Sequence, residues 1–313
     1  MKTFFTILLI LLVTTTNAQS TEGITNVPDT TYANWSAYQK EKKDHPHISL
    51  VQKGKLPKVK EHHNIIYCRI GTRKLKLDVF YPVKKANNKG VAIIIIHGGG
   101  WRSGSRFQHH PLAQHLAHAG YTVITPEYRL STEALYPAAV YDVKTVVKWV
   151  RAKAGKYNID DGKIAIAGFS AGGQLAALVG NTNHLKEFEG NNCLSSFSFT
   201  VNAIINLDGI LAFVHPESGE GDDSKKKSAA TLWFGYSKAE NAELWEQASP
   251  LNYAGENSVP TLFINSSVER MHAGRDDYLK VLAKNNIYGE VHTFQNSPHS
   301  FVLFNPWFTP TVN

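Results

Sequence analysis

Cysteine is scarce in this 313-residue chain, which contains only Cys68 and Cys193. Two cysteines in a chain of this length do not make the dense disulfide framework of a small secreted domain, and their spacing does not match a metal-ligand motif. A disulfide between them depends on how closely the fold brings the two side chains together, so the sequence leaves their pairing open. A cysteine scaffold and a cysteine metal site are therefore excluded.

Long hydrophobic runs are also scarce, and the one clear example lies at the N-terminus. Residues 4–13 are apolar apart from Thr6, follow Lys2, and lead through small polar residues to Ala18. This order predicts a secretory signal peptide over residues 1–18, because the run is shorter than the roughly 20 residues that span a bilayer. No later stretch is long and apolar enough to span a membrane. We therefore expect export to the periplasm or the extracellular space, with no membrane span.

Basic residues do not gather in the way that a nucleic-acid surface requires. The formal net charge is +7, and the densest basic run, residues 225–227, lies in a loop rich in Gly, Asp and Ser. No basic stretch is interleaved with aromatic residues, so nucleic acid is not expected as a partner. A moderately basic surface suits an acidic substrate or simply keeps the protein in solution.

Strand and helix patterns alternate after a polar segment over residues 19–60, which we expect to be extended with one short helix near residues 35–42. Hydrophobic periodicity predicts further helices over residues 108–119, 138–154, 171–179 and 275–285. It predicts eight strands, over residues 65–70, 75–81, 91–96, 121–125, 163–167, 201–206, 261–265 and 290–295. This alternation predicts an α/β domain over residues 61–313, with a mostly parallel eight-stranded sheet, an antiparallel start and helices on both faces. The less regular stretch over residues 182–248 is expected to form a cap or cleft-wall insertion.

One motif has the order expected of a serine nucleophile. It reads Gly-Phe-Ser-Ala-Gly over residues 168–172 and stands between a predicted strand and a predicted helix. A sharp turn from strand to helix lifts the serine hydroxyl out of the sheet, and glycines remove side chains that would clash in such a turn. A glycine-rich turn in any α/β protein is the alternative. The strand before and the helix after favour Ser170 as a catalytic nucleophile.

A second motif, His-Gly-Gly-Gly-Trp over residues 97–101, directly follows a buried strand. Consecutive glycines leave backbone N–H groups unobstructed, so those of Gly99 and Gly100, with that of Ala171, are expected to form an oxyanion hole. The N–H of Trp101 is an alternative donor. The loop lacks the Gly-Lys-Ser/Thr ending and the Gly-x-Gly-x-x-Gly spacing of phosphate-binding loops.

These two motifs in this order resemble the α/β-hydrolase superfamily, and specifically its esterases with a His-Gly-Gly-Gly loop. Two further stretches, over residues 127–130 and 136–143, are similar to those of hormone-sensitive-lipase-like and carbohydrate esterases. The resemblance covers residues 78–299 and implies a catalytic triad in the chain order Ser, acid, His. His299 follows the last predicted strand and is the expected general base, whereas its rival, His292, lies within that strand.

The triad acid is expected after the penultimate strand, predicted over residues 261–265. Glu269 lies four residues into the loop that follows, at a position where many members of the superfamily have Asp. A carboxylate of either kind can orient the imidazole and stabilise its cation. Asp276 and Asp277 are rivals, but they stand at the start of the next helix, where negative charge complements the helix dipole. We therefore expect Glu269 to complete the triad.

Charged residues beside the expected site favour an acidic substrate. Arg270, His272 and Arg275 could contact a substrate carboxylate, although helix capping or surface ion pairs would explain them equally well. Trp101 is expected to contact the substrate from the oxyanion loop. The loop over residues 269–277 also resembles that of secreted bacterial polysaccharide esterases. This resemblance implies an ester of a plant polysaccharide as substrate, with pectin methyl ester as the first expectation.

The same sequence features are compatible with several other functions. An acetyl or feruloyl xylan esterase, or a small-substrate carboxylesterase or lipase, would use the same Ser170 chemistry. A hydrolase fold that binds glycan without catalysis is a different class, disfavoured by the complete candidate triad. The expected reaction uses protein groups alone, so no metal or organic cofactor is expected, and the expected partner is a polysaccharide or oligosaccharide ester.

Overall fold

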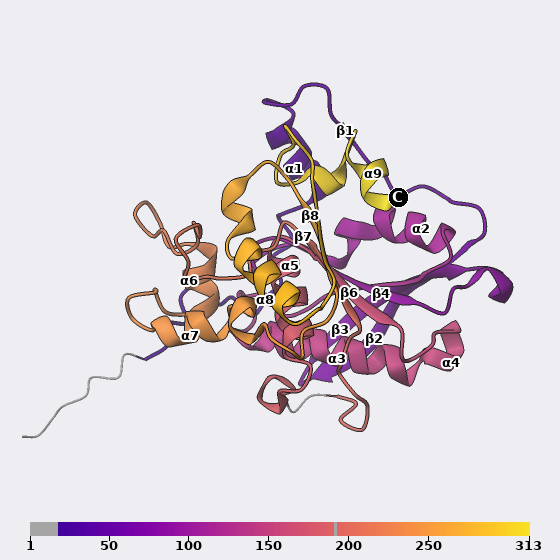
Figure 1. Ribbon diagram of the computed structural model, residues 1–313, viewed down its shortest axis with the longest axis horizontal. Coiled ribbons are helices and arrows are strands. Elements are labelled where there is room, and N and C mark those ends of the chain that lie inside the picture. The colour runs from indigo at the N-terminus through magenta and orange to yellow at the C-terminus, as the bar shows by residue number, and fades with distance from the viewer. Residues whose placement is uncertain (1–17, 191–192) are drawn as a thin grey trace, which may run out of the picture.

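The computed structural model describes residues 18–190 and 193–313. It shows a central sheet with helices on both sides, and two short helices, α6 (Ala229–Phe234) and α7 (Ala242–Gln247), beside it (Figure 1). Apart from Ala18, the predicted signal peptide lies outside the described residues. Within the two described ranges, no helix has the length and apolar character needed to cross a membrane.

The predicted eight-stranded, mostly parallel sheet is confirmed. Its strands are β2 (Val59–Ile70), β3 (Arg73–Pro82), β4 (Ala92–Ile96), β5 (Thr122–Pro126), β6 (Ile164–Phe169), β7 (Ala203–Leu207), β8 (Thr261–Asn265) and β9 (Gly289–Thr293). They lie in the order β2-β3-β5-β4-β6-β7-β8-β9. β3 pairs antiparallel with both of its neighbours, and all pairs from β5 to β9 are parallel. Every residue of β4 is buried, as expected for a run of isoleucines inside a parallel sheet.

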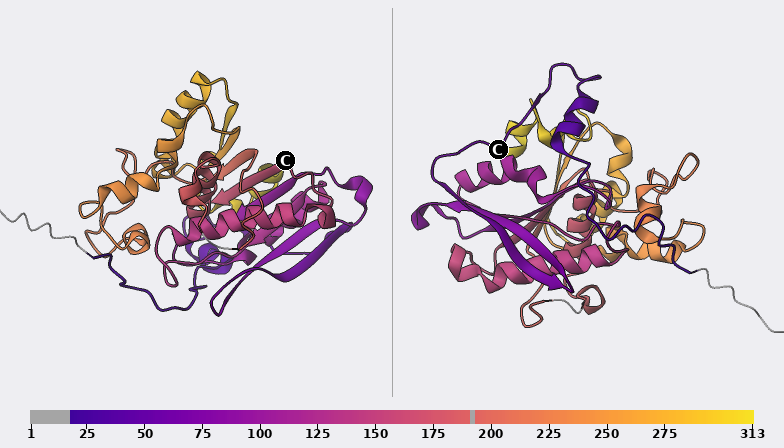
Figure 2. Two further views of the ribbon diagram at one scale, coloured as in Figure 1. Left: turned by 90° about the horizontal axis from the view of Figure 1, so that it is seen from below. Right: turned by 180° about the vertical axis from the view of Figure 1, so that it is seen from behind.

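Alternate residues of the central strands point into two hydrophobic cores, one on each face of the sheet. The main covering helices are α2 (His110–His118), α3 (Ala138–Ala152), α5 (Ala171–Asn181), α8 (Arg275–Lys284) and α9 (Phe308–Val312). Ile94 and Ile96 of β4 lie in the core beneath α3, α5 and α8. Ile93 and Ile95 lie in the core beneath α2 and α9. This period of two gives the sheet two apolar faces, so helices cover both, as Figure 2 shows.

The N-terminal segment folds back onto the sheet domain. It contains α1 (Asn34–Glu41), close to the predicted helix, and β1 (Ser49–Leu50), which pairs with β10 (Phe304–Asn305) near the C-terminus. Further upstream, the carbonyl oxygen of Asp29 accepts a hydrogen bond from the N–H of Gly104 at 3.0 Å. The expected extended lead-in therefore lies over the glycine-rich loop that follows β4.

The two cysteines form a disulfide. Cys68 lies in β2, Cys193 lies between α5 and β7, and their Cα atoms are 5.6 Å apart. The bond ties the irregular stretch after α5 to β2 at the edge of the sheet. The stretch over residues 182–248 also contains β7, α6 and α7, so it forms part of the sheet as well as packing beside it.

Candidate active site

Ser170 stands in the turn between β6 and α5. Its φ of 55° and ψ of -123° lie outside the helical region, and its N–H donates to the carbonyl oxygen of Leu207 at 2.8 Å. A Cβ on Gly172 would overlap the carbonyl oxygen of Ile96, so glycine at this position lets α5 approach the end of β4. The turn therefore fixes the Ser170 hydroxyl at the carboxyl ends of the parallel strands, as the sequence motif predicts.

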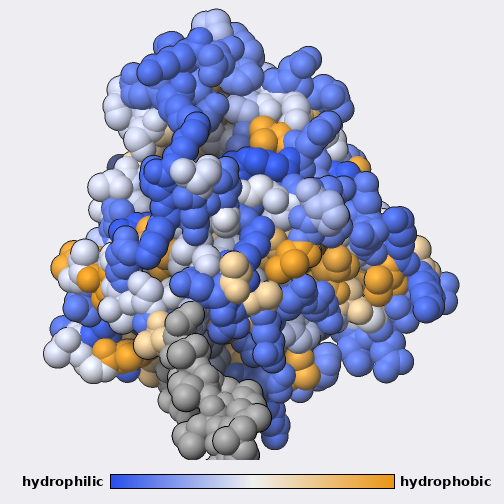
Figure 3. Space-filling model, turned by 90° about the vertical axis from the view of Figure 1, so that its left-hand side faces the viewer, coloured by the Kyte–Doolittle hydropathy of each residue, from blue (hydrophilic) through white to orange (hydrophobic). Residues whose placement is uncertain are grey.

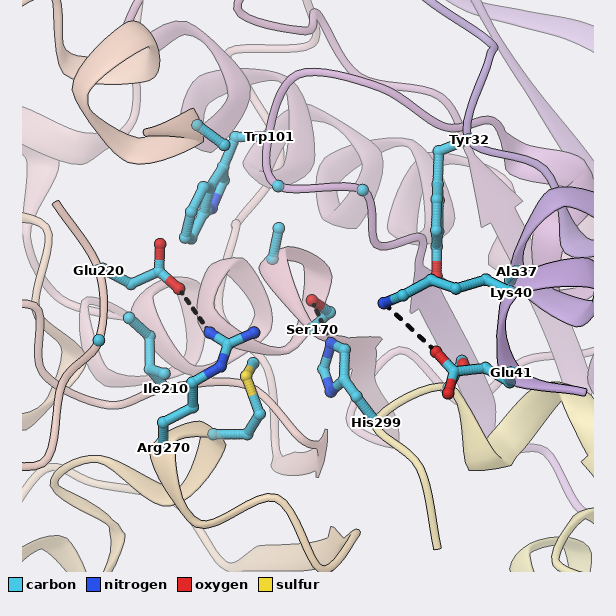
Figure 4. Close-up of a pocket in the computed structure, with 17 residues that line it drawn as sticks. Tyr32, Ala37, Lys40, Glu41, Trp101, Ser170, Ile210, Glu220, Arg270 and His299 are labelled. Atoms are coloured by element: carbon cyan, nitrogen blue, oxygen red, sulfur yellow. Dashed lines mark hydrogen bonds and ion pairs between the residues drawn. The ribbon is translucent and has the colours of Figure 1, made fainter. Parts of the chain in front are cut away.

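His299 lies beside Ser170 in the loop that follows β9. The distance from His299 Nε2 to Ser170 Oγ is 2.8 Å, within hydrogen-bond reach (Figure 4). The imidazole packs against Phe169, with ring centroids 4.8 Å apart. The rival His292 is exposed in β9, where its Nε2 lies 2.6 Å from Glu290 Oε1. The structure thus brings His299, and not His292, to the serine.

The carboxylate beside His299 belongs to Asp208, and the prediction of Glu269 as the acid is wrong. Asp208 Oδ2 lies 3.0 Å from His299 Nδ1, and the Asp208 side chain is fully buried. Glu269 is instead exposed in the loop after β8, and the rivals Asp276 and Asp277 are exposed on α8. A buried carboxylate is shielded from water, so it can hold the imidazole in one orientation.

The order of the strands explains why Asp208 takes this position. β7 lies directly beside β6, which carries Ser170, whereas β8 lies one strand further away. Asp208 directly follows β7 with a φ of 53°. Its Oδ1 accepts hydrogen bonds from Ser266 N at 2.8 Å and from Asn265 Nδ2 at 3.1 Å. These contacts hold the carboxylate with its other oxygen facing His299.

The glycine-rich loop lies where an oxyanion hole is needed. Gly99, Gly100 and Ala171 line the same pocket as Ser170. Gly99 has a φ of 124°, and a Cβ there would overlap the carbonyl group of Ser103, so only glycine fits this conformation. The structure therefore brings the three residues predicted to form the oxyanion hole to the pocket that holds Ser170.

Two buried side chains support this loop. The N–H of Gly98 donates to Gln108 Oε1 at 2.7 Å. His97 stacks on Tyr128, with ring centroids 4.4 Å apart and an interplanar angle of 17°. Burial lowers the pKa of His97 to about 4, so the ring is neutral at pH 7 and Nδ1–H can donate to the carbonyl oxygen of Gly98, 2.9 Å away. The loop is thus held by neutral groups.

The pocket around Ser170 has a volume of about 430 Å³. Ser170 and His299 lie between two of its walls (Figure 4). One wall includes Tyr32, Lys40 and Glu41 from the N-terminal segment, and the other includes Trp101, Ile210, Glu220 and Arg270. The place of the first wall at the pocket was not predicted, because its residues precede the predicted domain.

Two of the predicted substrate contacts line this pocket. Trp101 stacks on Trp233 with ring centroids 4.9 Å apart, so one face of its indole is covered. Burial raises the pKa of the Glu220 carboxyl group, whereas the positive charge of Arg270, whose Nη1 lies 3.4 Å from Glu220 Oε1, favours the ionised form. Glu220 therefore offsets the positive charge that Arg270 brings to the pocket.

His272 and Arg275, the other two predicted contacts, are not among the described residues that line the pocket. His272 Nε2 lies 3.1 Å from the carbonyl oxygen of Ser266, and Arg275 Nη1 donates to Asn265 Oδ1 at 3.0 Å. Both side chains therefore brace the two residues that hold Asp208. The structure does not bring them to the place where a substrate would bind.

One group of side chains outside the pocket has the composition of a metal site. Ligand atoms of His63, Asp78 and His110 lie within 4.8 Å of one another. Arg106 Nε lies 3.0 Å from Asp78 Oδ2, and His110 Nε2 lies 2.9 Å from the same oxygen. Because a guanidinium already supplies positive charge to this carboxylate, we interpret the group as an internal ion-pair network.

Solved structures share this architecture. A truncated carbohydrate esterase from gut microbiota aligns with a TM-score of 0.68 at 23% identity, over 81% of this chain and 94% of that chain. The apo form of esterase 2 from Thermogutta terrifontis aligns with a TM-score of 0.65 at 21% identity, over 84% and 94% of the two chains. A bifunctional GH43-CE protein of Bacteroides eggerthii aligns with a TM-score of 0.65 at 23% identity, over 80% of this chain and 36% of that chain. At these identities the likeness shows the fold alone, which is the predicted α/β-hydrolase fold.

Curated relatives match shorter parts of the chain. Esterase LipC of Mycobacterium tuberculosis is 28% identical over 195 residues, which are 61% of this chain and 47% of the relative. An arylesterase of Saccharolobus solfataricus is 38% identical over 117 residues, which are 36% of this chain and 38% of the relative. The matches span less than half of the length of these two relatives.

A family model matches more than half of the chain. The model of the BD-FAE family matches residues 77–271. This range contains the glycine-rich loop, Ser170 and Asp208, while His299 follows it. The chain therefore belongs to the BD-FAE family.

Proposed function

We propose that this protein is a carboxylic ester hydrolase that uses Ser170 as its nucleophile. The observation that carries the proposal is the hydrogen-bonded series from Ser170 through His299 to Asp208, which opens into a pocket. A hydroxyl, an imidazole and a buried carboxylate in this order suit nucleophilic acyl transfer. The esterases among the relatives support the same chemistry.

Each member of this series has its own part in the proposed reaction. As Ser170 Oγ attacks the ester carbonyl carbon, His299 Nε2 accepts the hydroxyl proton and then donates it to the oxygen of the leaving alcohol. Asp208 accepts the Nδ1–H of His299 and stabilises the imidazolium that forms. A water deprotonated by the same imidazole then hydrolyses the acyl-enzyme, which releases the acid and restores Ser170.

Negative charge develops on the carbonyl oxygen during both attacks. In the proposed reaction, the backbone N–H groups of Gly99, Gly100 and Ala171 donate to this oxygen. Ala171 is the first residue of α5, so the positive end of that helix dipole adds to the stabilisation.

We further propose an acyl ester of a plant polysaccharide as the substrate. The printed names of two structural neighbours support a carbohydrate ester, since one is a carbohydrate esterase and another a bifunctional GH43-CE protein. A pectin methyl ester is less well supported than the sequence suggests. Of Arg270, His272 and Arg275, which were expected to contact an acidic glycan, only Arg270 lines the pocket, and it lies beside Glu220. We therefore place an acetyl or feruloyl ester ahead of a pectin methyl ester.

A small-substrate carboxylesterase is the second candidate. It is favoured by the printed name of the arylesterase relative, which matches at 38% identity. Such an enzyme would use the same three residues and would differ only in how much of the alcohol portion the pocket must bind.

We also propose that the chain is exported. The apolar run over residues 4–13 supports a signal peptide. The disulfide between Cys68 and Cys193 supports the same proposal, because structural disulfides persist mainly in oxidising compartments.

Labelling with a fluorophosphonate tests the nucleophile directly. We expect one covalent adduct on the folded protein, located at Ser170 by peptide mass spectrometry, because a hydroxyl hydrogen-bonded to an imidazole attacks the phosphorus centre. The Ser170→Ala variant, shown by circular dichroism to be folded, should not react. A folded wild-type protein that takes up no label, or takes it up at another serine, would contradict the proposal.

Product analysis distinguishes the substrate classes. Acetylated xylan, feruloylated xylan and methylated pectin are incubated with the protein, and acetate, ferulate and methanol are measured separately. We expect acetate or ferulate. Methanol alone would support the pectin methyl ester, whereas hydrolysis of p-nitrophenyl butyrate with none of these products would favour the small-substrate enzyme. If the wild type releases none of these products and does not differ from Ser170→Ala in any measurement, the protein is a non-catalytic glycan binder or inert toward these esters.

A further inference from the structure

The N-terminal segment forms one wall of the pocket that holds Ser170. Tyr32, Lys40 and Glu41 line this wall, which we call the α1 wall because Lys40 and Glu41 lie in α1. Figure 4 shows their side chains on the opposite side of Ser170 from Arg270. The wall is therefore a distinct surface that faces the reacting atoms.

The α1 wall is attached to the loop that supplies the oxyanion hole. The N–H of Tyr32 donates to Ser103 Oγ at 2.8 Å, and Asn34 Nδ2 donates to the carbonyl oxygen of Gln108 at 2.9 Å. The side chain of the same Gln108 accepts the N–H of Gly98. These bonds give the wall a fixed position relative to the reacting carbonyl group, as a binding surface requires.

Polar groups on the α1 wall are available to a ligand. No described residue forms a hydrogen bond with the Tyr32 hydroxyl, and burial, together with nearby Glu41, raises the pKa of Tyr32 to about 12, so the hydroxyl is protonated. Lys40 Nζ lies 3.5 Å from Glu41 Oε1, with the Lys40 side chain 82% exposed. Nearby, Ser300 Oγ is buried without a partner among the described residues. The wall thus offers both donors and acceptors.

The opposite wall has a more apolar character near Ser170. Trp101, Ile210 and Met271 contribute to it, together with the Arg270–Glu220 pair. Apolar contacts suit an acyl group, whereas a hydroxyl-rich ring needs hydrogen-bonding partners.

The position of the base indicates which part of an ester faces which wall. The leaving alcohol oxygen must lie close to His299 Nε2, from which it receives its proton. In Figure 4 the His299 ring lies on the side of Ser170 that faces Lys40 and Glu41. The alcohol portion of the ester would therefore extend toward the α1 wall.

We infer that the α1 wall is the binding site for the sugar ring that bears the ester, with Tyr32 and Lys40 donating to sugar hydroxyls and Glu41 accepting from them. This inference rests on the proposed function. It assigns substrate selection to a segment that precedes the catalytic domain in the sequence.

Two esters of the same acid test the inference. Acetylated xylo-oligosaccharides and p-nitrophenyl acetate form the same acetyl-enzyme, so they differ only in the alcohol. Tyr32→Phe and Lys40→Met should each lower kcat/KM for the oligosaccharide about tenfold, because each removes one hydrogen bond to the substrate. Both variants should retain kcat/KM for p-nitrophenyl acetate within about twofold. Tyr38→Phe is the matched control, because this tyrosine lies on α1 outside the pocket and should change neither value.

The outcomes separate the inference from the proposed function. If p-nitrophenyl acetate is hydrolysed through Ser170 but the Tyr32 and Lys40 variants lose nothing on the oligosaccharide, the sugar site is overturned and the esterase stands. Equal losses on both esters overturn it as well, since they indicate a general disturbance of the pocket. Failure of the wild type to cleave the oligosaccharide while it cleaves p-nitrophenyl acetate also rejects the sugar site. Failure on both esters would reject the proposed function together with it.

Discussion

Replacement of Asp208 by Asn is expected to lower kcat/KM for p-nitrophenyl acetate by about 10³- to 10⁴-fold. The Asp208 carboxylate accepts the Nδ1–H of His299 at 3.0 Å, which leaves Nε2 free to take the proton of Ser170. An amide presents either an oxygen without charge or an N–H that favours the wrong tautomer of the imidazole. Most of the loss should therefore appear in kcat, because the pocket that binds the ester is unchanged.

Glu269→Gln is the matched control for this prediction. Glu269 is exposed in the loop after β8, so its neutralisation should change kcat/KM by no more than about twofold. Labelling of Ser170 by a fluorophosphonate should slow in the Asp208 variant and not in the Glu269 variant. A large loss of kcat/KM in Glu269→Gln, together with a small loss in Asp208→Asn, would identify Glu269 and not Asp208 as the triad acid.

A steep loss of stability on mild acidification is the second large effect that we expect. Burial lowers the pKa of His97 to about 4, and burial with the nearby His97 and His110 lowers that of His109 to about 3. The unfolded chain binds protons at these histidines near pH 6.5, whereas the folded chain does not. The free energy of unfolding should therefore fall as pH drops below 6.5, by about 1.4 kcal/mol per pH unit for each histidine, until the folded pKa is reached.

Urea unfolding between pH 7.5 and 4.5 measures this slope. The variant His109→Gln should show a slope smaller by about 1.4 kcal/mol per pH unit, because the proton that His109 binds on unfolding is no longer taken up. His184→Gln serves as the control for replacing a histidine at an exposed position. Burial raises the pKa of Asp78, but hydrogen bonds and Arg106 outweigh it and lower this pKa to about 2. The Asp78 carboxylate is therefore protonated only below the pH range of this experiment. Identical slopes in the wild type and His109→Gln would refute the prediction.

The pairing of Ser170 with His299 could be predicted because each residue is marked by local sequence. The turn at Ser170 requires a strand, small residues and a helix in immediate succession, and His299 follows the last strand pattern. The strands were predictable for a similar reason, since sheet burial leaves a local hydrophobic pattern. For β4 and β8 the expected and observed ranges agree to within one residue.

The acid was mispredicted because its position depends on the sheet and not on the loop. A carboxylate at the end of either β7 or β8 satisfies the chain order of the triad, and only the packing decides which one is buried beside His299. A signal for Asp208 was present, since it stands two residues beyond the strand predicted over residues 201–206. A carboxylate in a buried turn directly after a strand is a stronger candidate for the triad acid than a carboxylate four residues into a loop, as Glu269 is.

No local sequence pattern predicts that the α1 wall lines the pocket or that Glu220 balances the charge of Arg270. Tyr32 and Lys40 reach the site because the segment folds back over the glycine-rich loop, and Glu220 meets Arg270 across 50 positions of sequence. Such contacts arise from tertiary packing, which composition and periodicity do not encode. For this reason we predicted a cationic site for an acidic glycan, whereas the structure pairs Arg270 with Glu220 in the pocket.

The four strands that position Ser170, Asp208 and His299 are consecutive both in the chain and in the sheet. β6 leads to Ser170, β7 leads to Asp208, β8 ends at the residues that clamp this carboxylate, and β9 leads to His299. A slip of one residue in any of these pairings would move a side chain to the other face of the sheet and break the series. Because β9 is an edge strand, its local opening would abolish the proposed activity before the rest of the sheet unfolds. If the proposed activity is present, its rate would report the strand register at this edge of the molecule.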